Sequence, residues 1–189
     1  MISIQQQKVL KNIYSFGQRE GGFWNISPDT GQFLYSLILQ EKSKYIVEVG
    51  AGNGYSTLWL GLAVQKNKGK MVTFEFFLPK VEMCEKNLQK VGLDEIVDVI
   101  PSNASRVIPK LKRGVDFVFL DARKCDYLDQ LKLLLPKLKK DALIVADNVS
   151  SHAKELESYL HFVRTSSLFS SKFIDLGTGL EVSKLITKT

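Results

Sequence analysis

Three glycines lie close together in residues 48–56, which read EVGAGNGYS. Gly50, Gly52 and Gly54 let the backbone turn sharply and approach a ligand with no Cβ in the way. The predicted helix that follows would present its N-terminus to the same ligand, and a helix N-terminus favours negative charge. Glu75 follows the loop by about 20 residues, a distance at which an acid can accept both hydroxyls of a ribose. This pattern predicts a site for a cofactor that contains adenosine.

The glycine spacing separates this loop from those of dinucleotide-binding proteins. It reads GxGxG, whereas dinucleotide-binding loops read GxGxxG, so the spacing argues against a dehydrogenase. The alternative interpretation is a tight turn and a solvent-facing glutamate with no ligand. We favour the cofactor site because the loop lies between a predicted strand and a predicted helix.

Oxygen-bearing side chains follow two later predicted strands. Asp121 follows one strand, and Asp147 with Asn148 follows the next. The carboxyl ends of parallel strands open into one crevice, so we expect these side chains to converge. Two carboxylates and an amide oxygen are an incomplete hard ligand set, which suits Mg²⁺, whereas zinc would prefer nitrogen or sulfur. The alternative is that Asp147 and Asn148 turn the chain and Asp121 caps the next helix.

Lys124 follows Asp121 by three residues. On the first turn of a helix it would point back over the same crevice. A lysine beside a divalent cation is disfavoured in its charged form, so Lys124 is a candidate base for a hydroxyl of the substrate. A solvated surface lysine is the alternative, since most lysines are exposed.

The elements that must position these residues alternate between strand and helix, which predicts an α/β fold with a mostly parallel sheet. Several of the strands are continuous apolar runs, as expected when helices cover both faces. The sequence predicts strands at 45–49, 71–75, 96–100, 115–120 and 142–146, with helices near 55–66, 79–91, 103–112 and 125–138.

The two ends of the chain add further elements. Amphipathic helices are predicted at 5–16 and 29–40, the second capped by Ser27 with Pro28 at its first position. After a helix near 153–168, runs at 172–176 and 180–186 flank Gly177-Thr178-Gly179 with the spacing of an antiparallel hairpin. We expect one domain over residues 1–189, with N-terminal helices in 1–42 and the core in 43–189.

Composition narrows the class of protein. The chain has 189 residues, 44% apolar and 24% charged, with a net charge of +6. This composition is ordinary for a globular protein and excludes disorder, collagen and coiled coil.

Location and partners are also indicated by the sequence. With no apolar run of roughly 18 to 20 residues and no secretory signal, we expect a cytoplasmic protein without a membrane partner. The lysines are scattered, so we expect no nucleic-acid partner, although charge alone leaves RNA contact open. Cys84 and Cys125 form no CxxC pair, which predicts free thiols.

Taken together, the motifs resemble those of class I S-adenosylmethionine-dependent methyltransferases. The similarity is to the cation-dependent O-methyltransferase family, which includes catechol and caffeoyl-CoA O-methyltransferases, and it extends from about Trp24 to Ile186. It rests on the order and spacing of the segments NISPDTGQFL, VEVGAGNGYSTLWL, TFE, NAS, LDARK and ADNV.

The resemblance implies a Rossmann-like three-layer sandwich with a seven-stranded sheet and an antiparallel C-terminal hairpin strand. It implies S-adenosylmethionine and Mg²⁺, or another divalent cation, as cofactors, a small catechol-like or vicinal-hydroxyl acceptor, and a homodimer. The implied roles are the methionine moiety for Glu48 and the glycine loop, the ribose for Glu75, the adenine side for residues 103–105, and the catalytic base for Lys124. The implied cofactor-binding residues are Ile26, Glu48, Gly50, Gly52, Gly54, Tyr55, Ser56, Glu75, Asn103, Ala104, Ser105 and Asp121, and the implied metal ligands are Asp121, Asp147 and Asn148.

Two departures from the family pattern concern the acceptor. Arg123 replaces an acid of the usual DADK motif, which reverses the local charge. The loop that commonly follows Asn148 is short here, so the acceptor pocket is either open or completed by another subunit. His152 is interpreted as a surface or capping residue, because no second histidine has a ligand spacing.

Two alternative functions stay open. The chain could be an RNA or protein methyltransferase, or a cofactor-binding module without activity.

Overall fold

A computed structural model describes residues 2–187 of the chain. Met1, Lys188 and Thr189, which the predicted domain includes, lie outside the described residues. The helices are α1 (Ile4–Glu20), α2 (Pro28–Glu41), α3 (Tyr55–Lys66), α4 (Leu78–Gln89), α5 (Ala104–Val107), α6 (Tyr127–Leu134) and α7 (Glu157–Thr165), with short 3-10 helices at Ile108–Lys110, Lys124–Asp126 and Leu135–Lys137. The strands are β1 (Tyr45–Val49), β2 (Lys70–Glu75), β3 (Val97–Pro101), β4 (Val115–Leu120), β5 (Leu138–Ala146), β6 (Phe169–Ile174) and β7 (Leu180–Leu185).

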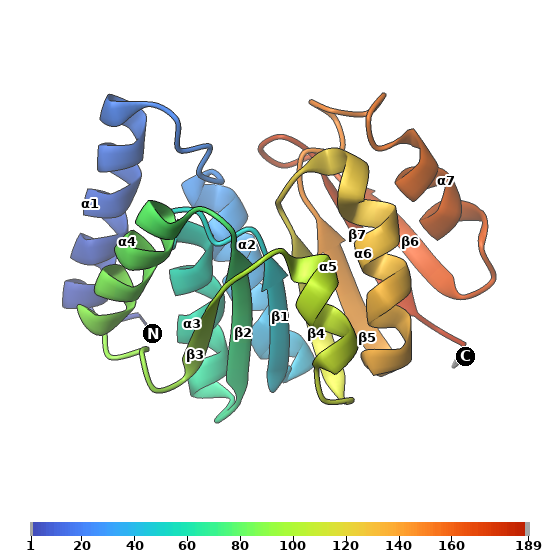
Figure 1. The fold of residues 1–189 in the computed structure, drawn as a ribbon, viewed down its shortest axis with the longest axis horizontal. Coiled ribbons are helices and arrows are strands. Elements are labelled where there is room, and N and C mark those ends of the chain that lie inside the picture. Colours follow the sequence, from blue (N-terminus) through green and yellow to red (C-terminus); the bar gives the residue numbers. More distant parts are fainter. Residues whose placement is uncertain (1, 188–189) are drawn as a thin grey trace.

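The strands form one mixed sheet in the order β3-β2-β1-β4-β5-β7-β6 (Figure 1). Strands β1 to β5 are parallel to one another, whereas β7 runs antiparallel to both β5 and β6. This confirms the predicted parallel sheet with an antiparallel hairpin at its C-terminal end.

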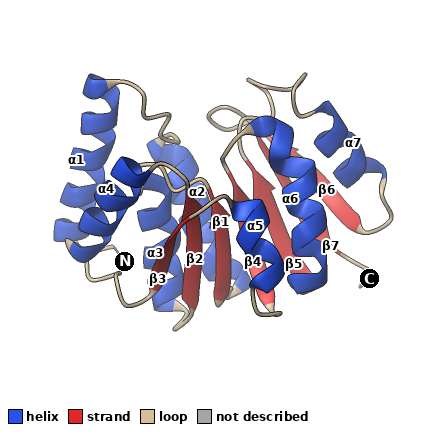
Figure 2. Cartoon of the chain, in the orientation of Figure 1, coloured by secondary structure: helices blue, strands red, loops and turns tan. Residues whose placement is uncertain are grey.

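Helices cover both faces of the sheet and form three layers with it (Figure 2). Successive side chains of a strand point to opposite faces, so Ile46 of β1 packs into one apolar cluster and Val47 into the other. The first cluster includes buried residues of α1, α2, α3 and α4. The second includes buried residues of α5, α6 and α7. None of the helices in residues 2–187 is long and apolar enough to cross a membrane.

Several predicted boundaries were wrong, for local reasons. The helix predicted at 103–112 leaves the α conformation after Val107, because Pro109 cannot continue an α-helix and residues 108–110 form a 3-10 turn instead. The helix predicted at 153–168 begins at Glu157. The residues between Ser150 and Glu155 have no large apolar side chain to bury, whereas the next residue, Leu156, is 1% exposed.

Strands β5 and β6 also differ from the prediction. β5 begins at Leu138 instead of residue 142, because Leu138 pairs with Val115 of β4. The charged residues 139–141 are therefore part of the strand. β6 begins at the buried Phe169 and ends at Ile174, earlier than the predicted 172–176. The N-terminus of α2 is as predicted: Ser27 is the N-cap, and its Oγ accepts from the backbone N–H of Thr30 at 3.0 Å.

Candidate active site

The glycine loop follows β1, Glu75 ends β2, and the acidic residues follow β4 and β5, and these four are consecutive strands of the sheet. Backbone hydrogen bonds continue between these strands beyond their ends. The Gly50 N–H donates to the Phe74 carbonyl at 3.0 Å, the Asp121 N–H to the Val49 carbonyl at 2.9 Å, and the Asp147 N–H to the Leu120 carbonyl at 3.0 Å. The structure therefore brings the glycine loop and the acidic residues to one edge of the sheet.

Gly50 and Gly52 have positive φ angles of 102° and 55°, but their surroundings differ. A Cβ on Gly50 would lie 2.3 Å from the backbone oxygen of Asp121, so the two loops touch there. A Cβ on Gly52 would meet nothing within 4 Å among the described residues. Gly52 therefore borders open space in which a ligand can approach the backbone, whereas Gly50 is required for loop-to-loop packing. Gly54 is the N-cap of α3.

Glu75 is tied to the glycine loop. Its Oε2 accepts from the backbone N–H of Gly52 at 2.9 Å, and its Oε1 accepts from the N–H of Phe77 at 2.9 Å. Each carboxylate oxygen has a second lone pair, so Glu75 can still accept hydroxyl hydrogen bonds from a ligand above the loop. Its expected role in binding a ribose stays a prediction.

Glu48 lies in β1, and its expected role in holding the methionine moiety stays a prediction. Its side chain is fully buried, and its carboxylate accepts hydrogen bonds of 2.6 Å each from the hydroxyls of Ser56, Thr57 and Thr73. Burial raises the pKa of Glu48 to about 7, although the three hydroxyl hydrogen bonds act in the opposite direction. Glu48 therefore joins β1, β2 and α3 beneath the loop, and the Ser56 hydroxyl is part of the same network.

Ile26 and Tyr55 belong to the apolar cluster formed with α1 to α4. The Tyr55 ring lies 5.3 Å from the ring of Tyr14 of α1, centroid to centroid. Trp24, two residues before Ile26, is 87% exposed, and the Lys80 ammonium lies 5.7 Å from the centre of its ring. Residues 24–26 thus pass from the surface into the core.

Asn103, Ala104 and Ser105 follow β3, next to Glu75. Glu75 is paired with Pro101 in the β2–β3 register, and Asn103 caps α5 by accepting from the Ser105 backbone N–H at 2.9 Å. Ala104 is buried. The three residues therefore lie on the β3 side of Glu75, and their expected contact with the adenine stays a prediction.

Asp121 and Asp147 face one lysine. Lys124 Nζ donates to Asp121 Oδ1 at 3.2 Å and to the Ala122 carbonyl at 2.9 Å, and both side chains of the Lys124–Asp121 pair are 14% exposed. Burial and the charge of Asp147 raise the pKa of Asp121, while Lys124 lowers it in part. Burial also raises the pKa of Asp147. Two largely buried carboxylates with one nearby cation leave an excess of negative charge, which fits a divalent cation.

Thr178, in the turn between β6 and β7, joins the two residues that follow β5. Asp147 Oδ1 accepts from the Thr178 hydroxyl at 2.7 Å and from the Asn148 N–H at 2.7 Å. Asn148 Nδ2 donates to Thr178 Oγ1 at 3.1 Å. The turn is predicted from the sequence, but the place of Thr178 in the site depends on the pairing of β7 with β5, which local sequence does not specify.

The ligand set available to a metal consists of oxygens. Among residues 2–187, no group of three or more His, Cys, Asp or Glu side chains is arranged to hold a metal ion. A cation here would therefore need the Asn148 amide oxygen as well as the two carboxylates. Mg²⁺ suits such a set, because it usually keeps several waters and takes only one or two carboxylates from the protein.

The other residues that sequence analysis singled out lie outside this ligand set. Arg123 is exposed and pairs with both carboxylate oxygens of Asp126 at 2.9 and 3.0 Å. His152 continues the turn after Asn148, with its N–H donating to the Asn148 carbonyl at 2.9 Å and its Nδ1 lying 2.9 Å from Ser151 Oγ. Both cysteines are free, Cys84 buried and Cys125 exposed.

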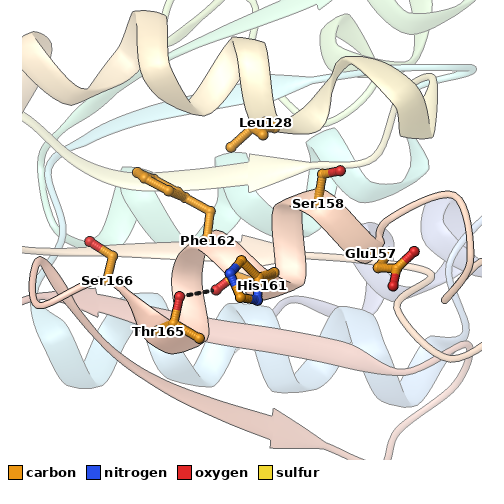
Figure 3. Close-up of a pocket in the computed structure, with 7 residues that line it drawn as sticks. All are labelled: Leu128, Glu157, Ser158, His161, Phe162, Thr165 and Ser166. Carbon is orange, nitrogen blue, oxygen red and sulfur yellow. Dashed lines mark hydrogen bonds between the residues drawn. The ribbon is translucent and has the colours of Figure 1, made fainter.

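A groove of about 580 Å³ lies elsewhere, between α6 and α7 (Figure 3). It is lined by Leu128 and by residues of and just after α7, including Glu157, His161 and Ser166. None of the predicted site residues lines it. His161 is thereby placed apart from the acidic residues.

Comparison with known proteins gives matches along most of the chain. A sequence model described as O-methyltransferase matches residues 1–170. A catechol O-methyltransferase from Niastella koreensis is 34% identical over 137 residues, which cover 70% of this chain and 62% of the relative. A second, from Mycobacterium tuberculosis, is 31% identical over 66% of this chain and 56% of its own length. The chain thus spans less than two thirds of these two relatives.

Solved structures show the same fold. The O-methyltransferase from Bacillus cereus, in complex with SAH, superposes with a TM-score of 0.85 at 19% identity, over 94% of this chain and 90% of that one. The O-methyltransferase TomG from Streptomyces achromogenes, in complex with SAM, gives a TM-score of 0.85 at 21% identity, over 98% and 91% of the two chains. These likenesses confirm the predicted architecture.

Proposed function

The chain belongs to the O-methyltransferase family, and on this premise we propose that it methylates one hydroxyl of a small catechol-like acceptor from S-adenosylmethionine, with help from a divalent cation. The observation that carries the proposal is the common location of two sites. The glycine loop follows β1 and Glu75 ends β2, and the acidic residues with Lys124 follow the adjacent strands β4 and β5. A cofactor and an acceptor would therefore meet at one edge of the sheet.

The glycine loop supports the cofactor part of the proposal. The open space above Gly52 would take the cofactor, and the N-terminus of α3 would favour the carboxylate of its methionine moiety. Glu75 would accept the ribose hydroxyls, with residues 103–105 beside the adenine. Glu48 would act from below, by holding Ser56 and Thr57 of α3 in place.

The acidic residues support the cation part. Asp121, Asp147 and Asn148 would hold the ion through side-chain oxygens. When bound, a divalent cation supplies Lewis acidity toward the hydroxyl oxygens of the acceptor. Relief of the repulsion between Asp121 and Asp147 would favour binding of the ion.

Lys124 is the base in this proposal. Its Nζ, in the uncharged form, takes the proton of the acceptor hydroxyl, and the resulting oxygen anion attacks the sulfonium methyl carbon in line. The new O–CH₃ bond forms as the C–S bond breaks, which yields a methyl ether and S-adenosylhomocysteine. The protein contributes mainly by positioning the two reactants, for which the effective gain can reach about 7 kcal/mol or more.

The test is transfer of labelled methyl from S-adenosylmethionine to a pool of catechol-type acceptors, with Mg²⁺ or with chelator. Transfer that disappears with chelator is expected. Equal transfer in both conditions would contradict the cation but keep the methyltransferase. Cofactor binding without transfer to any catechol would instead favour a macromolecular acceptor or a binding module without activity. A homodimer and a cytoplasmic location stay predictions from the sequence.

A further inference from the structure

The turn between β6 and β7 is packed against the residues that follow β5. The Thr178 carbonyl accepts from the Ser150 N–H at 3.1 Å, and the Gly179 carbonyl accepts from the Val149 N–H at 3.0 Å. These backbone contacts are independent of any ligand. They bring the Thr178 side chain next to Asp147 and Asn148, whose hydrogen bonds to it are 2.7 and 3.1 Å long.

The hydrogen-bonding capacity of one hydroxyl determines how both neighbours are oriented. A threonine hydroxyl has one proton to donate, and an ionised carboxylate can only accept. The Thr178 proton is therefore used on Asp147 Oδ1. Thr178 Oγ1 is left with acceptor capacity alone, so it can only be matched by the NH₂ group of Asn148 and not by its carbonyl oxygen.

These hydrogen bonds determine which side-chain oxygens of Asp147 and Asn148 stay free to bind a cation. Asp147 Oδ1 already accepts two hydrogen bonds, from Thr178 and from the Asn148 N–H, which leaves Oδ2. The Asn148 amide places its nitrogen toward Thr178, which leaves Oδ1. Within residues 2–187, neither of these two oxygens has a hydrogen-bond donor, and the same holds for Oδ2 of Asp121, whose Oδ1 is taken by Lys124.

We propose that Thr178 is a positioning residue of the acceptor site: its hydroxyl orients Asp147 and Asn148 so that one oxygen of each is presented to the divalent cation. The inference rests on the proposed function, since that function supplies the cation. Thr178 itself does not touch the ion. It acts through its two neighbours, as residues bonded to metal ligands generally do.

The experiment measures Mn²⁺ binding, because the free ion is counted directly by its electron paramagnetic resonance signal. Thr178→Val removes the hydroxyl with little change of shape, and Thr178→Ser keeps it. Thr165→Val is the matched control, since it removes an exposed hydroxyl of α7 whose one hydrogen bond within residues 2–187 goes to the His161 carbonyl. SAH affinity and the urea midpoint in chelator are measured on the same proteins.

We expect Thr178→Val to weaken Mn²⁺ binding about 10-fold or more. Thr178→Ser and Thr165→Val should stay within about threefold of the wild type, and SAH affinity should be unchanged in all variants. Equal Mn²⁺ affinity in Thr178→Val and the wild type would overturn the inference. Parallel losses of Mn²⁺ affinity, SAH affinity and urea midpoint would overturn it too, because they would indicate a structural role alone. A wild type that binds no Mn²⁺ would overturn the proposed cation itself, and the inference with it.

Discussion

The backbone N–H of Gly52 and Oε2 of Glu75 are joined by a hydrogen bond of 2.9 Å, although 23 residues separate them. The loop after β1 and Glu75, the last residue of β2, are thus one unit. Glu75 therefore has two roles, as an acceptor for ligand hydroxyls and as a support of the loop.

Glu75→Gln should weaken SAH binding about 10- to 100-fold. A hydrogen bond to a charged group contributes about 1.5–3 kcal/mol, and about 1.4 kcal/mol corresponds to a factor of ten in affinity. Isothermal titration calorimetry measures the change. Glu82→Gln, on the exposed surface of α4 and paired with Lys86, is the control and should bind SAH as the wild type does. Equal affinity in both variants would exclude Glu75 from the cofactor site.

Glu48 should make the stability of the protein depend on pH. Burial raises its pKa to about 7, from an ordinary value of 4.5, so the folded state holds the proton more tightly than the unfolded state. Its contribution to stability is then complete below about pH 4.5 and is lost as the pH rises through about 7. A shift of this size is worth about 3 kcal/mol.

The measurement is the free energy of unfolding in urea between pH 5 and pH 8. It should fall by about 2–3 kcal/mol more in the wild type than in Glu48→Gln, which cannot titrate. Asp121 and Asp147 also have raised pKa values, and most of their contribution cancels in the difference, apart from the small part of the Asp121 shift that comes from the charge of Glu48. Parallel curves for the two proteins would show that Glu48 does not titrate in this range.

The variant Asp147→Asn tests two properties of the site: the repulsion between its two carboxylates and its affinity for a cation. In chelator, Asp147→Asn should be about as stable as the wild type or slightly more so, because the negative charge that raises the pKa of Asp121 is gone. With Mg²⁺ at about ten times its dissociation constant, the wild type should melt about 3–5 °C higher. Asp147→Asn should show no such rise, whereas the exposed Asp129→Asn of α6 should respond like the wild type. If Mg²⁺ raised the melting temperature of Asp147→Asn as much as that of the wild type, the cation would have to bind at another site.

The parts of the site that could be predicted from sequence are those encoded locally. Gly50, Gly52 and Gly54 lie in one turn, and Asp121, Asp147 and Asn148 each follow an apolar strand, so strand order alone brings them to one edge. The parallel sheet and its terminal hairpin follow from the same apolar periodicity.

What sequence could not provide is the network around those residues. The burial of Glu48 depends on hydroxyls from α3 and from β2, and the role of Thr178 depends on the register of β7 against β5. Both are contacts between segments far apart in the chain. Helix and strand ends were missed where a proline or the spacing of apolar residues decided them, as at Pro109 and Leu156.

Lys124→Met should lower kcat about 10²- to 10⁴-fold, the range typical of a lost general base. SAH binding should change much less than kcat, since the polar contacts of Lys124 within residues 2–187 are with Asp121 and the Ala122 carbonyl, and Asp121 itself is retained. Mn²⁺ binding should be equal or tighter, because the lysine competes with a cation for the Asp121 carboxylate. Lys132→Met, on the exposed face of α6, is the control for loss of a positive charge. Full activity in Lys124→Met would exclude this lysine as the base.

Gly52→Ala should separate cofactor binding from folding. Gly52 has a φ of 55° and open space around it, so alanine should fold there at a cost of about 1–2 kcal/mol for the left-handed backbone. Its methyl group would occupy the space above the loop, and SAH binding should weaken about 10-fold or more. In Gly50→Ala the new Cβ would lie 2.3 Å from the backbone oxygen of Asp121, and no side-chain movement relieves that clash, so this variant should lose its stable fold.

The matched control for Gly52→Ala is Gly92→Ala, between α4 and β3. Gly92 has a φ of 67°, and a Cβ there would also meet nothing within 4 Å among the described residues. The two alanines should therefore destabilise the protein by similar amounts, as read from the urea midpoint, while only Gly52→Ala weakens SAH binding in calorimetry. Equal SAH affinity in both variants would mean that the space above Gly52 is not where the cofactor lies. Because the backbone strain is the same at both positions, such a result would count against the site itself and not against the folding of the loop.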